Sequence, residues 1–303
     1  MQKTFFIFIF SICSFIIKAQ TTFPSNGAPN ETHTLYAFTN CTLHVDVDIT
    51  IINASLLIQD GKVIRFGEKL EAPKEAISVD LKGKHIYPAF IDLYNDYGMP
   101  EIKKGDRIDA PKKGAYAWNQ AIKSETEAQK LFLHDQAKAD ELRKQGFATV
   151  LTFSKDGIVR GSGALVFLAN AKENESILKD RAAAFYSFKK GTSPQAYPSS
   201  LMGAIALLRQ TYYDAAWYAS NTSTGQKIEY NITLDAFNKL QELPSIFEGG
   251  DKYNDVRGKK IADEFKTNYI IKGGGNEYQR LYDIQNTNSK FIIPINYPEA
   301  LDV

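Results

Sequence analysis

The sequence predicts an α/β protein that begins with a small antiparallel β domain. Short β-prone runs joined by tight turns occupy residues 35–86, and strands alternate with helices from residue 87 to residue 303. Strands and helices that alternate over short connections are typical of a parallel sheet covered by helices. Hydrophobic residues make up 44% of the 303 positions, enough for a sizeable core. The net charge of +1 gives no reason to expect a nucleic-acid partner.

The first twenty residues differ in composition from the rest of the chain. A positive charge at Lys3 precedes an apolar run from Phe5 to Ile17, and Ala19 follows it. This pattern is typical of a signal peptide and is short for a membrane span. We expect residues 1–20 to be cleaved, residues 21–34 to form a loose leader, and the mature protein to be exported, periplasmic or extracellular. An N-terminal membrane anchor is the alternative.

The β domain is predicted from short alternating or apolar runs. Asp60 and Gly61 stand between two such runs and predict a two-residue hairpin turn, because glycine supplies the positive φ that the turn needs. Once residues 1–20 are removed, Cys41 is the only cysteine, so no internal disulfide is expected. The predicted strands are residues 35–38, 42–45, 54–58, 63–64 and 77–81.

Helix signals appear in the second part of the chain. Ser124 and Glu127 have the spacing of a capping box and predict a helix that ends at Gly146. Ser199 or Ser200 predicts the start of a longer helix with one apolar stripe. That stripe consists of Leu201, Ile205, Leu208 and Tyr212. Further strands are predicted at residues 147–153, 163–168, 245–247, 268–271 and 291–293, and further helices at residues 256–265 and 277–284.

Three stretches carry a resemblance to a known superfamily. They are NASLLIQDGKVIRFG (residues 53–67), KGKHIYPAFIDLYNDYG (residues 82–98) and ELRKQGFATVL (residues 141–151). In order and spacing they resemble the amidohydrolase superfamily of metal-dependent hydrolases, in particular its imidazolonepropionase-like members. The resemblance implies that residues 35–86 are the composite β domain of those enzymes and that residues 87–303 belong to a (β/α)8 barrel.

The resemblance also implies where a metal would bind. Members hold one or two divalent metals, of the zinc type, at the C-terminal end of the barrel, and hydrolyse non-peptide carbon–nitrogen bonds. Their first barrel strand supplies a His-x-His pair at the positions that Tyr94 and Asp96 occupy here, two and four residues after Asp92. Asp92, Tyr94 and Asp96 alternate along one strand and therefore share a face. A phenol with a pKa of about 10 is a poor metal ligand at neutral pH, so the chain is expected to be inactive by itself.

The later ligands of the superfamily also have no counterpart. The strands that begin at Ser245 and Asn268 carry no histidine. The four histidines, His33, His44, His85 and His134, show no metal-ligand spacing, and we expect them to be structural or surface residues. A serine nucleophile elbow is also missing from the sequence.

The barrel is expected to be incomplete. A (β/α)8 barrel takes about 250 residues, and the stretch from residue 87 to the end is shorter. The segment GTSPQAYPSSLMG (residues 191–203), with the run around Tyr94, resembles the degenerate front module of large exported bacterial proteins with two amidohydrolase-like modules. This implies a fragment whose partner is a downstream catalytic module. An open barrel would leave a strand edge unpaired, so low stability is expected.

Three functional interpretations remain open. The chain is a hydrolase by descent that lacks its metal ligands, or a structural or binding module that supports a catalytic one. In the third interpretation, Asp92 and Asp96 hold a hard ion through oxygen.

Two glycine-rich segments give weaker signals. Gly161 to Gly163 predicts a turn or bulge within a strand, and Gly273 to Gly275 predicts a strand-to-helix loop, with an anion-binding nest as the alternative.

Overall fold

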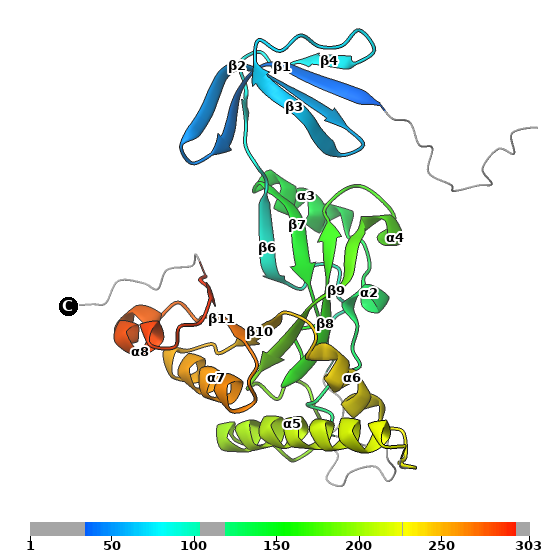
Figure 1. Ribbon diagram of the computed structural model, residues 1–303, viewed down its shortest axis with the longest axis vertical. Coiled ribbons are helices and arrows are strands. Elements are labelled where there is room, and N and C mark those ends of the chain that lie inside the picture. Colours follow the sequence, from blue (N-terminus) through cyan, green and yellow to red (C-terminus); the bar gives the residue numbers. More distant parts are fainter. Residues whose placement is uncertain (1–33, 104–118, 226, 295–303) are drawn as a thin grey trace, which may run out of the picture. The chain divides into compact units, whose positions relative to one another are not determined.

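The computed structural model describes residues 34–103, 119–225 and 227–294. The chain divides into two compact units, residues 1–88 and residues 89–303, each described by itself (Figure 1). The predicted signal peptide, the predicted leader up to residue 33 and His33 lie outside the described residues.

The first unit is a five-stranded sheet. Its strands are β1 (Leu35–Asp46), β2 (Ile49–Gln59), β3 (Lys62–Glu68), β4 (Ile77–Asp80) and β5 (His85–Ile86). The order is β3-β2-β1-β4, and β5 also pairs with β1. Asp60 and Gly61 have φ values of 52° and 70° and form the predicted two-residue turn between β2 and β3.

The prediction of an antiparallel domain holds only for β1 to β3. Both β4 and β5 run parallel to β1. A connection longer than a hairpin turn separates β3 from β4, which lets the chain return to the start of β1 before it pairs. The core of the sheet consists of the buried Cys41, Leu43 and Ala54.

The second unit contains a seven-stranded sheet in the order β12-β11-β10-β9-β8-β7-β6. The strands are β6 (Phe90–Asn95), β7 (Phe147–Thr152), β8 (Val159–Phe167), β9 (Ile177–Ser187), β10 (Ser245–Glu248), β11 (Tyr269–Lys272) and β12 (Phe291–Ile292). Strands β9 to β12 are parallel, as are β6 and β7.

Strand β8 departs from the predicted parallel arrangement. It runs antiparallel to both of its neighbours. The segment between β7 and β8 is too short for the crossover that a parallel strand needs, so the chain turns back directly. Among the described residues no pairing joins β6 to β12, so the sheet is open and no closed barrel is formed.

Helices pack around this sheet. They are α2 (Ala128–Leu131), α3 (Gln136–Lys144), α4 (Glu173–Ser176), α5 (Leu201–Ser223), α6 (Ile232–Leu240), α7 (Lys252–Glu264), the 3₁₀ helix η1 (Glu277–Arg280) and α8 (Leu281–Gln285). Ser200 caps α5 as predicted, because its hydroxyl oxygen accepts from the Gly203 N–H at 3.2 Å. The predicted stripe of α5 lies in or against the larger apolar core.

The single helix predicted from Ser124 to Gly146 is wrong. Two short helices, α2 and α3, occupy this stretch, and residues 132–135 separate them. Ser124 caps no helix, whereas the Asp135 carboxylate accepts from the Lys138 N–H and begins α3. A capping box measures only local preference, and here a buried Ser124 and the packing of Phe132 against Tyr97 override it.

The two faces of the sheet have separate apolar cores. Along β10 and β11, Phe247, Tyr269 and Ile271 pack with helices α5, α6 and α7. The alternate residues Ile246 and Ile270 pack on the other face, with Phe153 and Phe185. This alternation follows from the two-residue period of a strand. The second face carries the polar side chains described next.

Candidate functional site

A set of charged side chains lies along the edge of the sheet where the parallel strands end. Glu248 is the last residue of β10, and Lys272 is the last residue of β11. Tyr94 lies near the end of β6. Arg160 lies near the start of β8 and reaches the same edge because β8 runs in the opposite direction. In α/β folds this edge is where functional side chains usually gather.

Arg160 is the centre of the set. Its side chain is only 2% exposed, and its three donor nitrogens all have partners. The guanidinium donates to the Tyr94 hydroxyl at 2.8 Å, to a Glu248 carboxylate oxygen at 2.7 Å and to the Gly157 carbonyl at 3.1 Å. The second Glu248 oxygen accepts from Lys189 Nζ at 2.9 Å. We call Tyr94, Arg160, Lys189 and Glu248 the arginine network.

The charges of the arginine network stabilise one another. Burial by itself would raise the pKa of Glu248, but the Arg160 and Lys189 cations outweigh burial and lower the pKa to about 2. Burial raises the pKa of Tyr94 well above its usual range, and the Glu248 carboxylate adds to that effect against the opposing charge of Arg160. At neutral pH the network therefore consists of a neutral phenol, a carboxylate and two cations.

The Tyr94 ring is held by aromatic contacts beneath and by cations around it. Its centroid lies 4.9 Å from that of Phe153 and 6.1 Å from that of Phe185, both in edge contacts. The ammonium groups of Lys155 and Lys272 each lie over this ring, 5.5 Å from its centroid. A ring face carries negative charge density, which attracts such cations.

Asp92 and Asp96 have partners of their own. One Asp92 oxygen accepts from the Tyr94 backbone N–H at 2.9 Å, and the other accepts from the Asn95 amide at 2.7 Å. Asp96 is exposed, and its carboxylate pairs with Lys155 at 3.2 Å. Asp92, Tyr94 and Asp96 therefore follow one another on or next to β6, but each binds a different group.

The described histidines bind partners outside the arginine network. His44 and His85, in the first unit, form a hydrogen-bonded pair at 2.8 Å between Nε2 and Nδ1, which their spacing in the sequence did not indicate. Strand β5 beside β1 brings them together. His134 accepts from or donates to the Tyr97 hydroxyl at 3.0 Å. Across the described residues, no three His, Cys, Asp or Glu side chains are arranged to hold a metal ion.

Of the two glycine-rich segments, one lies within β8 and the other follows β11. Gly161 to Gly163 lies within β8 with a register shift, as the bulge prediction requires. In the segment from Gly273 to Gly275, the N–H groups of Gly274 and Gly275 donate to the Glu277 carboxylate. This segment is an anion-binding nest, and its anion is a side chain of the same loop. It is thus not open to a cofactor.

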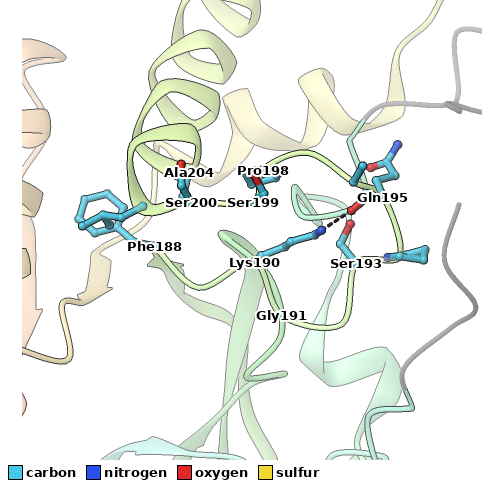
Figure 2. Close-up of a pocket in the computed structure, with 12 residues that line it drawn as sticks. Phe188, Lys190, Gly191, Ser193, Gln195, Pro198, Ser199, Ser200 and Ala204 are labelled. Atoms are coloured by element: carbon cyan, nitrogen blue, oxygen red, sulfur yellow. Dashed lines mark hydrogen bonds between the residues drawn. The ribbon is translucent and has the colours of Figure 1, made fainter. Parts of the chain in front are cut away.

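A cavity of about 590 Å³ lies beside the loop that joins β9 to α5 (Figure 2). Its polar groups bind one another across the loop. Lys190 Nζ donates to the Gln195 carbonyl, and the Gln195 side chain accepts from the Gln120 N–H at 2.6 Å. The same loop is anchored by Asp156, whose carboxylate accepts from the Thr192 N–H and hydroxyl. These contacts indicate a structural role.

Comparison with known proteins gives a match in structure only. No protein-family model matches the sequence, and no curated protein matches it. An amidohydrolase from Thermotoga maritima has a similar structure, with a TM-score of 0.67 and 21% identity over 86% of this chain and 70% of that one. The chain is similar in fold to this amidohydrolase. At this identity the similarity establishes the fold alone.

Two other solved structures are more distant. An amidohydrolase gives a TM-score of 0.40 at 14% identity over 86% of this chain and 66% of that one. A prolidase complexed with N-methylphosphonate-L-proline gives 0.39 at 10% identity over 87% of this chain and 79% of that one. Similarities this weak add nothing to the argument. The amidohydrolase resemblance of the sequence is confirmed by the first structure.

The amidohydrolase fold raises the question whether these residues fit a divalent metal. The arginine network does not fit one, because a buried guanidinium already binds both Tyr94 and Glu248. A divalent ion beside it would place like charges together where little water screens them. Asp92 belongs to no set of three described His, Cys, Asp or Glu side chains that could hold a metal ion.

Sequence reasoning did not single out Arg160, Lys189, Glu248 or Lys272. A signal for two of them was present, since Glu248 and Lys272 each end a short apolar strand. A charged residue at the end of a buried strand is a reason to expect a functional edge. Arg160 gave no such signal, because the reversal of β8 that brings it to this edge is a property of the whole sheet.

Proposed function

We propose that this chain is a non-hydrolytic binding module built on the amidohydrolase fold. The observation that carries the proposal is the Arg160 guanidinium bound to Tyr94 and Glu248 at the edge where the superfamily resemblance puts the metal. A fixed cation in that place can stabilise negative charge. It cannot activate a water molecule for attack as a metal does.

The charges at this edge support a binding role over a purely structural one. Replacing a buried ion pair by apolar residues is often neutral or stabilising, so burial of Arg160 and Glu248 is not explained by stability alone. Lys189 is 65% exposed, so it leaves the network open to solvent on one side. A half-open cationic edge on a rigid sheet suits recognition of a ligand.

A hydrolysis assay with added metal tests the proposal. The purified protein is incubated with zinc or manganese and a set of dipeptides, cyclic imides and N-acyl amino acids. We expect no turnover above the metal and buffer control. Turnover that requires metal and disappears in Asp92→Asn would overturn the proposal and favour the oxygen-ligand hydrolase, in which Asp92 and Asp96 hold the ion.

A second candidate function is support of a catalytic amidohydrolase-like module. Strand β6 favours it, because among the described residues it pairs only with β7 and carries exposed apolar side chains. Ile91 is 58% exposed and Leu93 is 46% exposed, and both lie on one face of the strand. Such an apolar edge strand readily pairs with another chain.

The test of this second candidate is whether Leu93 matters for association. We expect the protein to self-associate or to bind a hydrophobic dye, and Leu93→Lys to reduce both, since a charge on an edge strand opposes strand pairing. Lys144→Glu, far from β6 in the chain and on an exposed helix end, serves as the control. A monodisperse wild-type monomer without dye binding would remove the support for this candidate.

We also propose that the protein is exported, on the basis of the first twenty residues. The described residues contain no helix that is long and apolar enough to cross a membrane. Intact-mass measurement of the protein isolated from its own cells should give a chain that starts near Gln20 or Thr21. A mature chain that retains Met1 would contradict export by cleavage.

A further inference from the structure

Four cations gather at the C-terminal edge of the second sheet. Arg160 and Lys189 share the single carboxylate of Glu248. Lys155 pairs with Asp96 at 3.2 Å. The Lys272 side chain, by contrast, has no hydrogen bond or ion pair with any described residue, and its contact is with the face of the Tyr94 ring. Of these four cations, Lys272 is the one that no described carboxylate pairs with.

The acidic groups near Lys272 do not supply the balancing charge. Asp255 is fully buried, and burial together with the neighbouring Glu277 raises its pKa to about 8, so it is uncharged at neutral pH. The Glu277 oxygens accept from the N–H groups of Gly274 and Gly275. Lys272 is therefore a cation without a dedicated partner.

Two of these cations contact the same Tyr94 ring. Lys155 follows the end of β7 and Lys272 ends β11, yet each ammonium group is 5.5 Å from the same ring centroid. Two like charges around one ring repel each other unless an anion lies with them. The ring itself rests on Phe153 and Phe185, which fixes its position and that of both cations.

We propose that this edge binds a small organic anion, through a carboxylate or phosphate group held by Lys155 and Lys272 above Tyr94. This inference rests on the proposed function, since it names the ligand class of the same site. Ammonium groups bind such oxygens as point charges with strong, charge-assisted hydrogen bonds. Within the arginine network, Arg160 keeps Tyr94 in place through its hydroxyl, and the positive charges of Arg160 and Lys189 repel other cations.

Exposure of the cations supports access by a ligand. The Lys155 side chain is 34% exposed and that of Lys189 is 65% exposed, whereas Arg160 is 2% exposed. The anion would therefore meet the two lysines around Tyr94 and the outer lysine, but not the guanidinium, which is buried and already hydrogen-bonded through each of its three nitrogens. An anion with an apolar or planar body would also cover the Tyr94 ring.

Calorimetric titration tests the proposal with two probes, inorganic phosphate and succinate, at constant ionic strength set with chloride. The full chain is compared with Lys272→Gln, Lys155→Gln and Lys144→Gln. Lys144 is an exposed lysine that precedes β7, at the opposite end of that strand from Lys155. We expect binding of at least one probe, weakened about tenfold by loss of either site lysine and unchanged in Lys144→Gln.

The outcomes separate the ligand sources and the two proposals. Binding of phosphate alone indicates a phosphorylated ligand, and binding of succinate alone indicates a carboxylate. No binding beyond chloride, or equal binding by Lys272→Gln, overturns the anion site while leaving the non-hydrolytic assignment intact. If Lys272→Gln does not fold, Lys272→Arg serves instead, and it must retain binding. Metal-dependent turnover in the separate hydrolysis assay would overturn the proposed function, whatever the titration gives.

Discussion

Arg160 shows how one residue can change the chemistry of a familiar fold. It comes from a strand that runs against its neighbours, and its guanidinium binds Tyr94 from β6 and Glu248 from β10. Planar geometry and five donors let arginine bind several groups at once, which lysine could not do in this place. The result is a fixed positive charge at the strand ends.

Loss of the Arg160 charge is expected to destabilise the protein strongly. Arg160→Met leaves the buried Glu248 carboxylate with only the exposed Lys189 as a partner, and breaking a buried pair costs about 3–5 kcal/mol. Lys189→Met is the matched control, because it removes the other cation from the same carboxylate at the surface. We expect it to cost less than about 1 kcal/mol.

Urea denaturation of the two variants measures these changes in the free energy of unfolding. The double variant Arg160→Met/Glu248→Gln should recover part of the loss, because no buried charge is left without a partner. Equal stability of Arg160→Met and Lys189→Met would mean that the arginine network does not order the edge as described.

At this scale the sequence predicted which residues share a strand but not what they bind. Asp92 and Tyr94 lie on β6 as predicted, whereas Asp96 follows the last residue of that strand. The partner of Tyr94 was out of reach, because Arg160 is 66 positions away and meets it only through the order of the strands. Glu248 lies a further 88 positions along the chain from Arg160. Such contacts depend on tertiary structure, which no local pattern encodes.

Strand β8 shows how a glycine makes such an arrangement possible at the scale of an element. Gly161 has a φ of 77° beside a register shift, next to Arg160 in the chain. A Cβ atom added there would overlap the Thr126 carbonyl oxygen. The bulge therefore needs glycine for its backbone conformation and for the close approach of another segment.

Gly161→Ala is accordingly expected to cost more than about 2 kcal/mol, since strain at positive φ and a steric overlap add together. Gly67→Ala in β3 is the matched control, because nothing lies within 4 Å of its added Cβ. Thermal unfolding should show a clear loss for the first variant and little change for the second. A small effect of Gly161→Ala would mean that the bulge does not require glycine at this position.

Helix α7 carries a buried acid that makes stability depend on pH. Asp255, on α7, has no hydrogen-bond donor for either oxygen, and burial with the nearby Glu277 raises its pKa to about 8. In the unfolded chain its pKa is about 3.9. The folded protein therefore binds this proton more tightly than the unfolded chain does. As a result, the free energy of unfolding decreases as pH rises from about 4 towards 8.

Asp255→Asn should remove this pH dependence, because an amide resembles the protonated acid in shape and never ionises. We expect the variant to be more stable than the wild type at pH 8 and closer to it at pH 5, measured by urea denaturation at both values. Glu248 has the opposite effect. Because its pKa is lowered to about 2, the stability that its carboxylate contributes is lost as pH falls below 4.5. A wild-type stability that rises from pH 5 to pH 8 would contradict the account of Asp255.

Local sequence patterns predicted helix starts and turns correctly where tertiary packing did not oppose them. Ser200 caps α5, and Asp60 with Gly61 makes the hairpin turn, because both depend on nearby residues alone. The capping-box pattern at Ser124 failed because that serine is buried and the chain breaks between α2 and α3. The antiparallel direction of β8 was also not predicted. The length of the connection between two strands limits whether they can run parallel, whereas its residue composition does not.

At the scale of the whole molecule, the sequence motifs identified the fold more reliably than the chemistry. The resemblance carried by residues 53–67, 82–98 and 141–151 agrees with the structural match to the Thermotoga maritima amidohydrolase. These motifs build strands and turns, which persist while individual side chains change. The described residues form no closed barrel, because their sheet remains open between β6 and β12.

In the function proposed here, the arginine network takes the place that a metal would have at the C-terminal edge of the second sheet. The most direct test is titration of the protein with zinc and with manganese, followed by dialysis and elemental analysis. The account predicts well under one metal ion per chain, and no difference between the wild type and Asp92→Asn. One metal ion per chain that is lost in Asp92→Asn or Asp96→Asn would contradict it.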